Sequence, residues 1–88
     1  MPENKILDIL KKSFGPIEIK LHNDSPKHIG HSHKGEGGHY SVFMISEAFH
    51  GLSRIERERS VVTALKPLFD AQLIHAIQLT LRSPEESH

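Results

Sequence analysis

The 88-residue sequence predicts an α+β fold of order αββααβ, in which helices pack on one face of a three-stranded mixed sheet. Three observations support this fold class. Residues 3–14 and the segment after Ser53 show helical periodicity, and residues 17–23 alternate between apolar and polar side chains. Residues 39–46 are rich in β-branched and aromatic side chains, and residues 74–81 alternate with Ile77, Leu79 and Leu81 on one face. The first two strands are expected to form a hairpin, and the helical crossover lets the third run parallel to one of them. The whole chain, residues 1–88, is expected to be a single domain.

In the first helix, apolar side chains recur at helical spacing, and Gly15-Pro16 supplies a stop because proline cannot continue a helix. These apolar positions are Ile6, Leu7, Ile9, Leu10 and Phe14. In the following strand Ile17, Ile19 and Leu21 alternate with polar residues, so all three are expected to face the core.

After the second strand, Phe49 is expected in the core and Gly51 in a turn. Ser53 and Glu56 form an S-x-x-E capping box that begins the next helix, and Pro67 ends that helix before one short further turn. Its inward positions are expected to be Ile55, Val61, Val62 and Leu65.

In the last strand, alternation places His75 on the same face as Ile77, Leu79 and Leu81, at the rim of that apolar face. A histidine there is either half-buried and satisfied by hydrogen bonds or presents one ring nitrogen outward as a ligand. The final letters, SPEESH, read as a polar tail.

Charge and cysteine content narrow the function classes. Lys plus Arg and Asp plus Glu number 11 each, so no overall positive charge favours nucleic acid or an anionic membrane. The chain has no cysteine and so cannot supply thiolates to a metal centre. It lacks a membrane-length apolar run and the pattern of a signal peptide, so a cytoplasmic location without membrane contact is expected.

The segment HIGHSHKGEGGH, residues 28–39, contains four of the eight histidines and four of the six glycines. It belongs to a loop at about residues 24–38, far longer than the two to five residues of ordinary hairpin loops, and loops this long are usually functional or disordered. The loop histidines support three interpretations: a nonspecific metal-binding tract, a merely polar loop, or the source of one specific ligand. They are His28, His31, His33 and His39.

Several segments together resemble the BolA-like family. The run HYSVFMISEAFHGLSRIERER, residues 39–59, has the family's aromatic-led strand, then Ser, Phe-x-Gly and an Arg-x-Arg pair. IHAIQLTLRSPEE, residues 74–86, resembles its C-terminal strand with the Ile/Val-His-Ala triplet, and DSPKHIGH, residues 24–31, resembles the start of the loop in histidine-bearing members. The resemblance implies a fold related to class II KH domains, in agreement with the element order given above.

The resemblance also implies a function: a non-enzymatic iron–sulfur adaptor that binds a monothiol glutaredoxin and co-ligates a bridging [2Fe–2S] cluster, for assembly, trafficking or iron sensing. His75 matches the family's cluster-ligand histidine. The second ligand would come from the loop, with His31 the first choice and His33 and His28 as alternates. The glutaredoxin and its glutathione would supply the sulfurs, and no cofactor is expected to bind the isolated chain tightly. Imidazole ligation raises the reduction potential relative to all-cysteine ligation, and affinity should fall below about pH 6.5.

The alternative function is a DNA-binding regulator of stress response and cell morphology, as members of this family are often described. Its sequence support is one basic patch, which could instead meet the protein partner or be an ordinary solvated helix face. The patch comprises Arg54, Arg57, Arg59 and Lys66. Glu58 replaces the histidine usual between the arginines, so that histidine's role cannot transfer, and LKPLFD lacks the GxxG clamp of a KH-type RNA binder.

No enzyme is indicated. Asp24, Ser25, Ser32 and the loop histidines could be combined into a catalytic triad, but they share one glycine-rich loop without an oxyanion scaffold.

Overall fold

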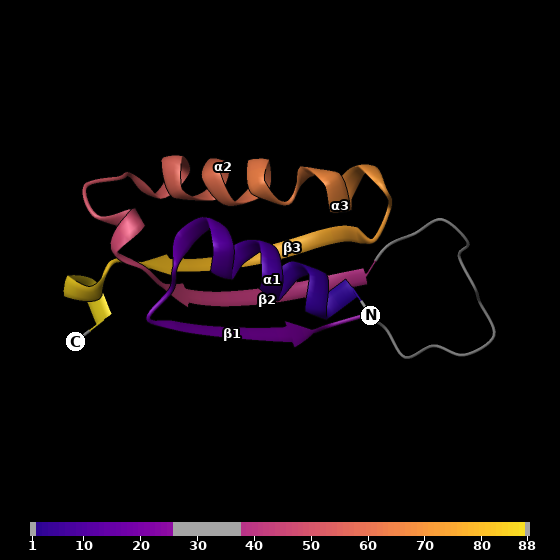
Figure 1. Cartoon of the computed structure of the whole chain (residues 1–88), viewed down its shortest axis with the longest axis horizontal. Helices are drawn as coiled ribbons and strands as arrows, with labels where there is room; N and C mark the ends of the chain where they lie inside the picture. Colours follow the sequence, from indigo (N-terminus) through magenta and orange to yellow (C-terminus); the bar gives the residue numbers. More distant parts are fainter. Residues whose placement is uncertain (1, 26–37, 88) are drawn as a thin grey trace.

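The structure, a computed structural model, describes residues 2–25 and 38–87 (Figure 1). Its elements follow the expected order. The helices are α1 (Pro2–Phe14), α2 (Arg54–Ala64) and α3 (Lys66–Asp70), the strands are β1 (Glu18–Asn23), β2 (Gly38–Ile45) and β3 (Ile74–Arg82), and the 3₁₀ turns are η1 (Glu47–Phe49) and η2 (Pro84–Ser87). No helix among these residues is long and apolar enough to cross a membrane.

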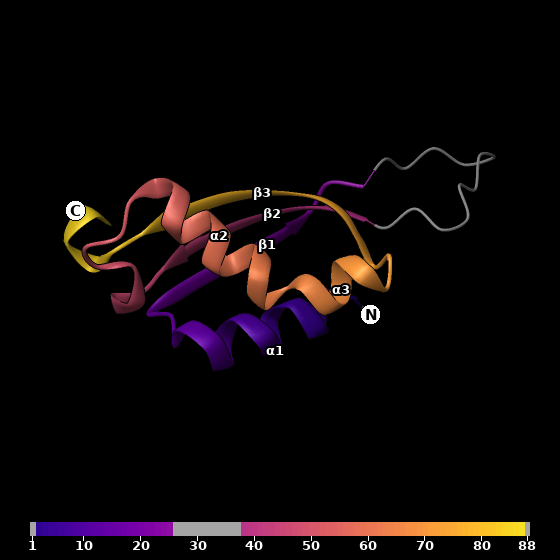
Figure 2. The same cartoon turned by 90° about the horizontal axis from the view of Figure 1, so that it is seen from above.

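The sheet has the order β1-β2-β3, with β1 antiparallel and β3 parallel to β2. Figures 1 and 2 show α1, α2 and α3 on one face of this sheet, and no helix of the described residues lies on the other face. The mixed sheet covered on one side is therefore confirmed. Because β2 and β3 are parallel, residues that begin these two strands lie at the same end of the molecule.

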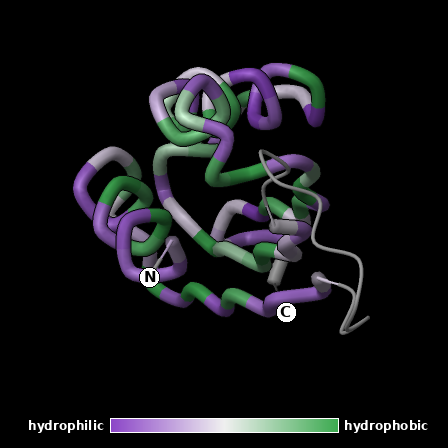
Figure 3. Tube along the Cα trace, turned by 90° about the vertical axis from the view of Figure 1, so that its right-hand side faces the viewer, coloured by the Kyte–Doolittle hydropathy of each residue, from purple (hydrophilic) through white to green (hydrophobic). Residues whose placement is uncertain are grey.

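The core lies between the helices and the sheet. Figure 3, seen along the strands, shows hydrophobic and hydrophilic residues mixed within the turns of the helices, as is typical of helices that cover a core. The fully buried hydrophobic side chains include Ile6, Leu10, Met44, Phe49, Val61 and Leu65. Phe49 thus packs in the core as predicted, and Gly51 adopts a φ of 78°, a turn conformation that favours glycine.

The expected capping box at the start of α2 is confirmed, but the expected inward face is right only for Val61 and Leu65. Ser53 Oγ accepts from the Glu56 N–H, and the Glu56 carboxylate accepts from the Ser53 N–H. Ile55 and Val62 are instead 56% and 42% exposed, whereas Arg57, Val61 and Leu65 are buried. These three residues follow i, i+4, i+8 spacing. Because one of them is an arginine, a search for apolar periodicity does not detect this buried face of α2.

Two chain segments also differ from expectation. Ile17 is 66% exposed rather than inward, because the chain bends there, before the regular alternation of β1 begins. The residues expected to be a polar tail form η2 and pack against the domain: Ser83 is 3% exposed, and the Glu86 N–H donates to the Ser83 carbonyl at 3.0 Å.

Candidate functional site

His39 and His75 meet at the end of the sheet where β2 and β3 begin. Their ring centroids lie 5.1 Å apart, with the ring planes tilted by 42°. The two residues are far apart in sequence, and the parallel pairing of β2 with β3 brings them together. His75 is exposed and His39 is half-buried, so both rings are accessible from outside.

A β-bulge determines where His75 points. Gly38 pairs with Ile74 and His39 with Ala76, so His75 is an extra residue without a partner in β2. A bulge breaks the two-residue alternation and re-aims the neighbouring side chains. The expectation that His75 shares a face with Ile77 is therefore wrong: its ring joins that of His39, on the sheet face away from the helices.

The backbone of His39 is held by a short chain of hydrogen bonds at the end of β1. The His39 N–H donates to Ser25 Oγ at 3.0 Å, and its carbonyl accepts from the Asp24 N–H at 2.7 Å. The Ser25 N–H donates to Asn23 Oδ1 at 2.9 Å, and the Asn23 amide donates to Glu3 Oε2 at 2.8 Å. His39 is therefore fixed to the folded domain through α1 and β1.

The neighbouring glycine is also constrained by packing. A Cβ atom on Gly38 would lie 2.7 Å from the Tyr40 ring, which is itself 4% exposed. Burial and the nearby charge of Glu3 raise the pKa of the Tyr40 phenol, so it stays neutral at physiological pH. Position 38 thus requires a residue without a side chain, and the start of β2 packs closely on the core.

The four described histidines divide into two kinds. His22 Nε2 lies 3.3 Å from an Asp24 carboxylate oxygen, and His50 Nδ1 lies 2.6 Å from Glu85 Oε2. His39 and His75 make no side-chain hydrogen bond or ion pair within residues 2–25 and 38–87, and their ring contact is with each other. As far as residues 2–25 and 38–87 are concerned, their ring nitrogens are therefore available to a ligand.

The loop donors His28, His31 and His33 lie outside the described residues, so their prediction as ligands stays untested. Within the described part of the chain, no three His, Cys, Asp or Glu side chains are grouped to hold a metal ion. A metal bound at His75 would therefore need further ligands from the loop or from a second molecule.

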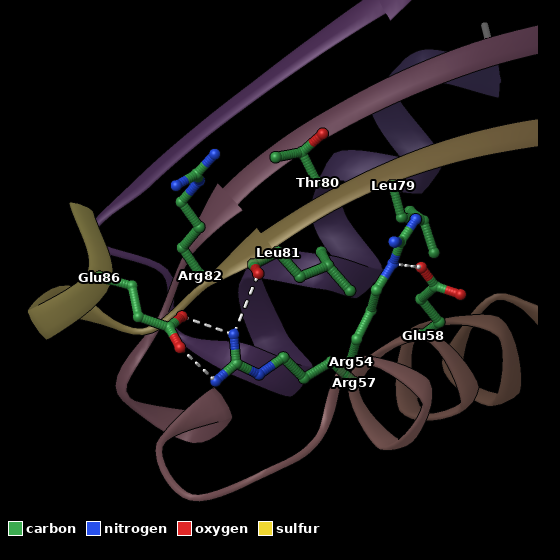
Figure 4. Close-up of a pocket in the computed structure, with 8 residues that line it drawn as sticks. All are labelled: Arg54, Arg57, Glu58, Leu79, Thr80, Leu81, Arg82 and Glu86. Carbon is green, nitrogen blue, oxygen red and sulfur yellow. Dashed lines mark hydrogen bonds and ion pairs between the residues drawn. The ribbon is translucent and has the colours of Figure 1, made fainter.

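The predicted basic patch on α2 separates into unlike residues. Arg57 is 8% exposed, and its guanidinium makes four hydrogen bonds within the protein. It donates to the carbonyls of Leu52 and Leu81, and it forms a two-point ion pair with Glu86; Figure 4 shows the contacts to Leu81 and Glu86. The two contacts to Glu86 measure 2.6 and 3.1 Å. This placement gives Arg57 a structural role and argues against it as a direct contact for DNA or a partner.

The ion pair also explains the acidity of Glu86. Hydrogen bonds from Arg57, then from the Ser83 backbone, lower the pKa of Glu86 to about 2. In return, hydrogen bonding to Glu86 raises the pKa of Arg57. Glu86 is therefore ionised at neutral pH and joins η2 to α2.

The rest of the patch is exposed and partly neutralised. Arg54 pairs with Glu58 at 3.1 Å and Lys66 with Asp70 at 2.8 Å, each as an i, i+4 pair. Arg59 is exposed. Such surface pairs contribute little to stability and open readily, so these three side chains can still reach a partner.

Comparison with known proteins identifies the family. A model of the BolA-like protein family matches residues 10–86, nearly the whole chain. The chain belongs to the BolA-like family. The resemblance that its strand and loop motifs suggested is thereby confirmed.

Individual relatives agree with this assignment. The chain is 37% identical to a BolA-like protein of Dictyostelium discoideum over 84 residues, which cover 96% of this chain and 72% of that protein. The solved BolA domain of SufE1 from Arabidopsis thaliana superposes with a TM-score of 0.81 at 29% identity, covering 94% and 92% of the two chains. A relative from Haemophilus influenzae, 29% identical over 88% of this chain and 72% of its own length, is described as a DNA-binding transcriptional regulator.

Sequence reasoning missed the pairing of His39 with His75. It grouped His39 with the loop histidines and did not rank it as a ligand. A partial signal was present: the second and third expected strands each carry a histidine at or next to their first residue, and strands that run parallel begin at the same end of a sheet. The bulge that turns His75 toward His39 has no comparable signal in the sequence.

Proposed function

We propose that this domain is a non-enzymatic iron–sulfur adaptor that binds a monothiol glutaredoxin and shares a [2Fe–2S] cluster with it. The observation that supports the proposal is His75, an exposed imidazole at the start of β3 with no carboxylate partner in the described chain. It occupies the family's cluster-ligand position, and a second imidazole of this chain would complete the nitrogen donors. We propose the cytoplasm as the site of action.

The donor set fits a shared cluster rather than a resident one. The chain has no cysteine, so all protein and glutathione thiolates must come from the partner. Bound between the two proteins, the cluster would supply one-electron chemistry and iron in transferable form. Two imidazoles bind iron less tightly than thiolates once protons compete for the nitrogens, and this makes the cluster easier to hand on.

The test is reconstitution of the cluster with a monothiol glutaredoxin and glutathione, in the presence and absence of this domain. We expect the visible absorption and circular dichroism to change when the domain is added, because nitrogen replaces sulfur on one iron. His75→Ala should restore the spectrum of the glutaredoxin alone.

The matched control is His22→Ala. His22 is also an exposed histidine on the sheet, but its ring lies against Asp24 and away from β3. This variant should leave the mixed-ligand spectrum intact. The proposal is wrong if His75→Ala gives the same spectrum as the wild-type domain.

A DNA-binding role is the second candidate, favoured by the Haemophilus influenzae relative and by the exposed Arg54 and Arg59. It predicts duplex binding at physiological salt with a clear salt dependence. The double variant Arg54→Ala/Arg59→Ala should weaken binding in fluorescence anisotropy, whereas Lys20→Ala on β1 should not. Arg57 is unsuitable for this test because its removal would disturb the fold. Binding that is absent at physiological salt excludes this role.

A further inference from the structure

We infer that His39 and His75 form one two-imidazole metal site, with His39 as the second nitrogen donor of this chain. The site is separate from the loop histidines His28, His31 and His33. Its assignment to cluster iron rests on the proposed function, whereas the pairing of the two rings as metal ligands does not.

The spacing of the rings suits a shared metal. Two imidazoles bound to one tetrahedral metal through bonds of about 2.1 Å have ring centroids roughly 5 Å apart. The observed separation is 5.1 Å, and the 42° tilt means that the rings are not stacked face to face. A metal could therefore bind both residues with small rotations of their side chains.

Among the described residues, the rings of His39 and His75 contact each other and have no ionic partner. Asp24 is occupied on both sides, because one of its oxygens lies 3.3 Å from His22 Nε2 and the other accepts from the Ser41 hydroxyl. Asp24 therefore contacts His22 and Ser41 and neither ring of the pair. A polar depression on the sheet face, lined by His39, Ser41 and Gln78 among others, gives solvent access to the His39 side of the site.

Both residues are also held in advance of binding. Hydrogen bonds from Asp24 and to Ser25 fix the backbone of His39, and the bulge in β3 fixes the direction of His75. A ligand on such a frame loses less conformational entropy on binding than one on a long glycine-rich segment. This difference favours His39 over a loop histidine as the permanent partner of His75.

The first experiment uses zinc ions and the isolated domain, because zinc is diamagnetic and binds imidazole. The background variant His28→Gln/His31→Gln/His33→Gln removes the loop histidines. We expect it to bind zinc at pH 7.5, with the His39 and His75 ring resonances shifting together in NMR titrations. Adding His39→Gln or His75→Gln should each reduce affinity about tenfold or more, a loss of roughly 1.4 kcal/mol.

His22→Gln, made in the same background, is the matched control and should change zinc affinity less than about twofold, well under 1 kcal/mol. The inference is overturned if His39→Gln leaves the affinity unchanged, or if His22→Gln reduces it as much as His39→Gln does. Either result would show that the two rings are not a specific metal site.

The second experiment repeats the cluster reconstitution with the same variants. The triple loop variant should keep the mixed-ligand visible spectrum, and His39→Gln should alter it. If no mixed cluster forms with any variant while zinc still binds the pair, the proposed function fails and the two-histidine site stands. If the spectrum depends on a loop histidine and not on His39, the adaptor function stands and His39 is not the second donor.

Discussion

Polar side chains that lie at the two ends of β3 have opposite roles in the molecule. At its C-terminal end, the Arg57 guanidinium is enclosed by Glu86 and two backbone carbonyls. At its N-terminal end, His75 projects into solvent beside His39, and no carboxylate pairs with either ring within residues 2–25 and 38–87. A charged group that is fully bonded within the protein stabilises the fold, whereas accessible ring nitrogens without partners can bind something else.

The largest loss of stability should follow from removing the arginine contacts at the C-terminal end of β3. Arg57→Ala would leave the Glu86 carboxylate and the Leu52 and Leu81 carbonyls without their donor. We expect the free energy of unfolding to fall by about 2 kcal/mol, because Arg57 is buried while the half-exposed Glu86 carboxylate can be rehydrated. Urea denaturation measures this change.

Arg54→Ala is the matched control for that experiment, because Arg54 is an exposed arginine one turn earlier in α2 with an i, i+4 partner. It should cost less than about 0.5 kcal/mol. Equal losses for the two variants would mean that the buried arginine is no more important to the fold than a surface one.

A smaller change in stability is expected when pH is lowered, because Glu86 at the C-terminal end of β3 then becomes protonated. The pKa of Glu86 is about 2 in the folded protein against an ordinary 4.5, so its contribution is fully present above pH 4.5 and disappears as pH falls toward 2. Thermal melting of wild type and Glu86→Gln should differ by a constant amount near neutrality and converge in acid. Curves that stay parallel down to pH 2 would contradict the ion pair.

The opposite end should also lose stability as pH falls, but in a higher pH range and only with metal present. Imidazole must be deprotonated to bind zinc, so stabilisation by zinc should decline as pH falls toward about 5, where the Glu86 interaction is still intact. The same melts, repeated with zinc, therefore separate the two ends in one data set.

The smallest effect should come from Ser25→Ala, which removes the acceptor of the His39 N–H and loosens the support of one ring. We expect about 1 kcal/mol or less of lost stability and about a threefold decrease in zinc affinity. Ser60→Ala serves as the control, because it removes a hydroxyl bonded at 2.9 Å to the Glu56 carbonyl, far from the histidines. Identical zinc affinities in both variants would show that Ser25 does not position His39.

Much of the fold could be predicted because its signals are local. The 3.6-residue period of α1, the capping box at Ser53 and the alternation of β1 each lie within a few residues, and the αββααβ order then restricts the topology. The buried face of α2 could not be predicted this way. It depends on Arg57 finding Glu86, a partner 29 positions later in a segment that reads as a tail.

The candidate site shows the same division. His75 could be selected from a motif, but its direction depends on a bulge in the ladder between β2 and β3. One unpaired residue places the side chains that precede it in the strand on the face opposite to the one that alternation predicts. The contact with His39 then follows from the pairing of two strands that are far apart in sequence. Neither hydrophobic periodicity nor composition predicts this pairing.

The joining of η2 to α2 makes the last residues of the domain part of its framework. Glu86 lies near the end of the chain, yet it closes the bonding of a buried arginine, and Glu85 beside it holds His50 in the turn after β2. Removal of residues 85–88 would release both contacts and leave α2 with a buried arginine that lacks its carboxylate partner. Resistance of residues 85–88 to proteolytic removal therefore reports whether η2 is packed against α2.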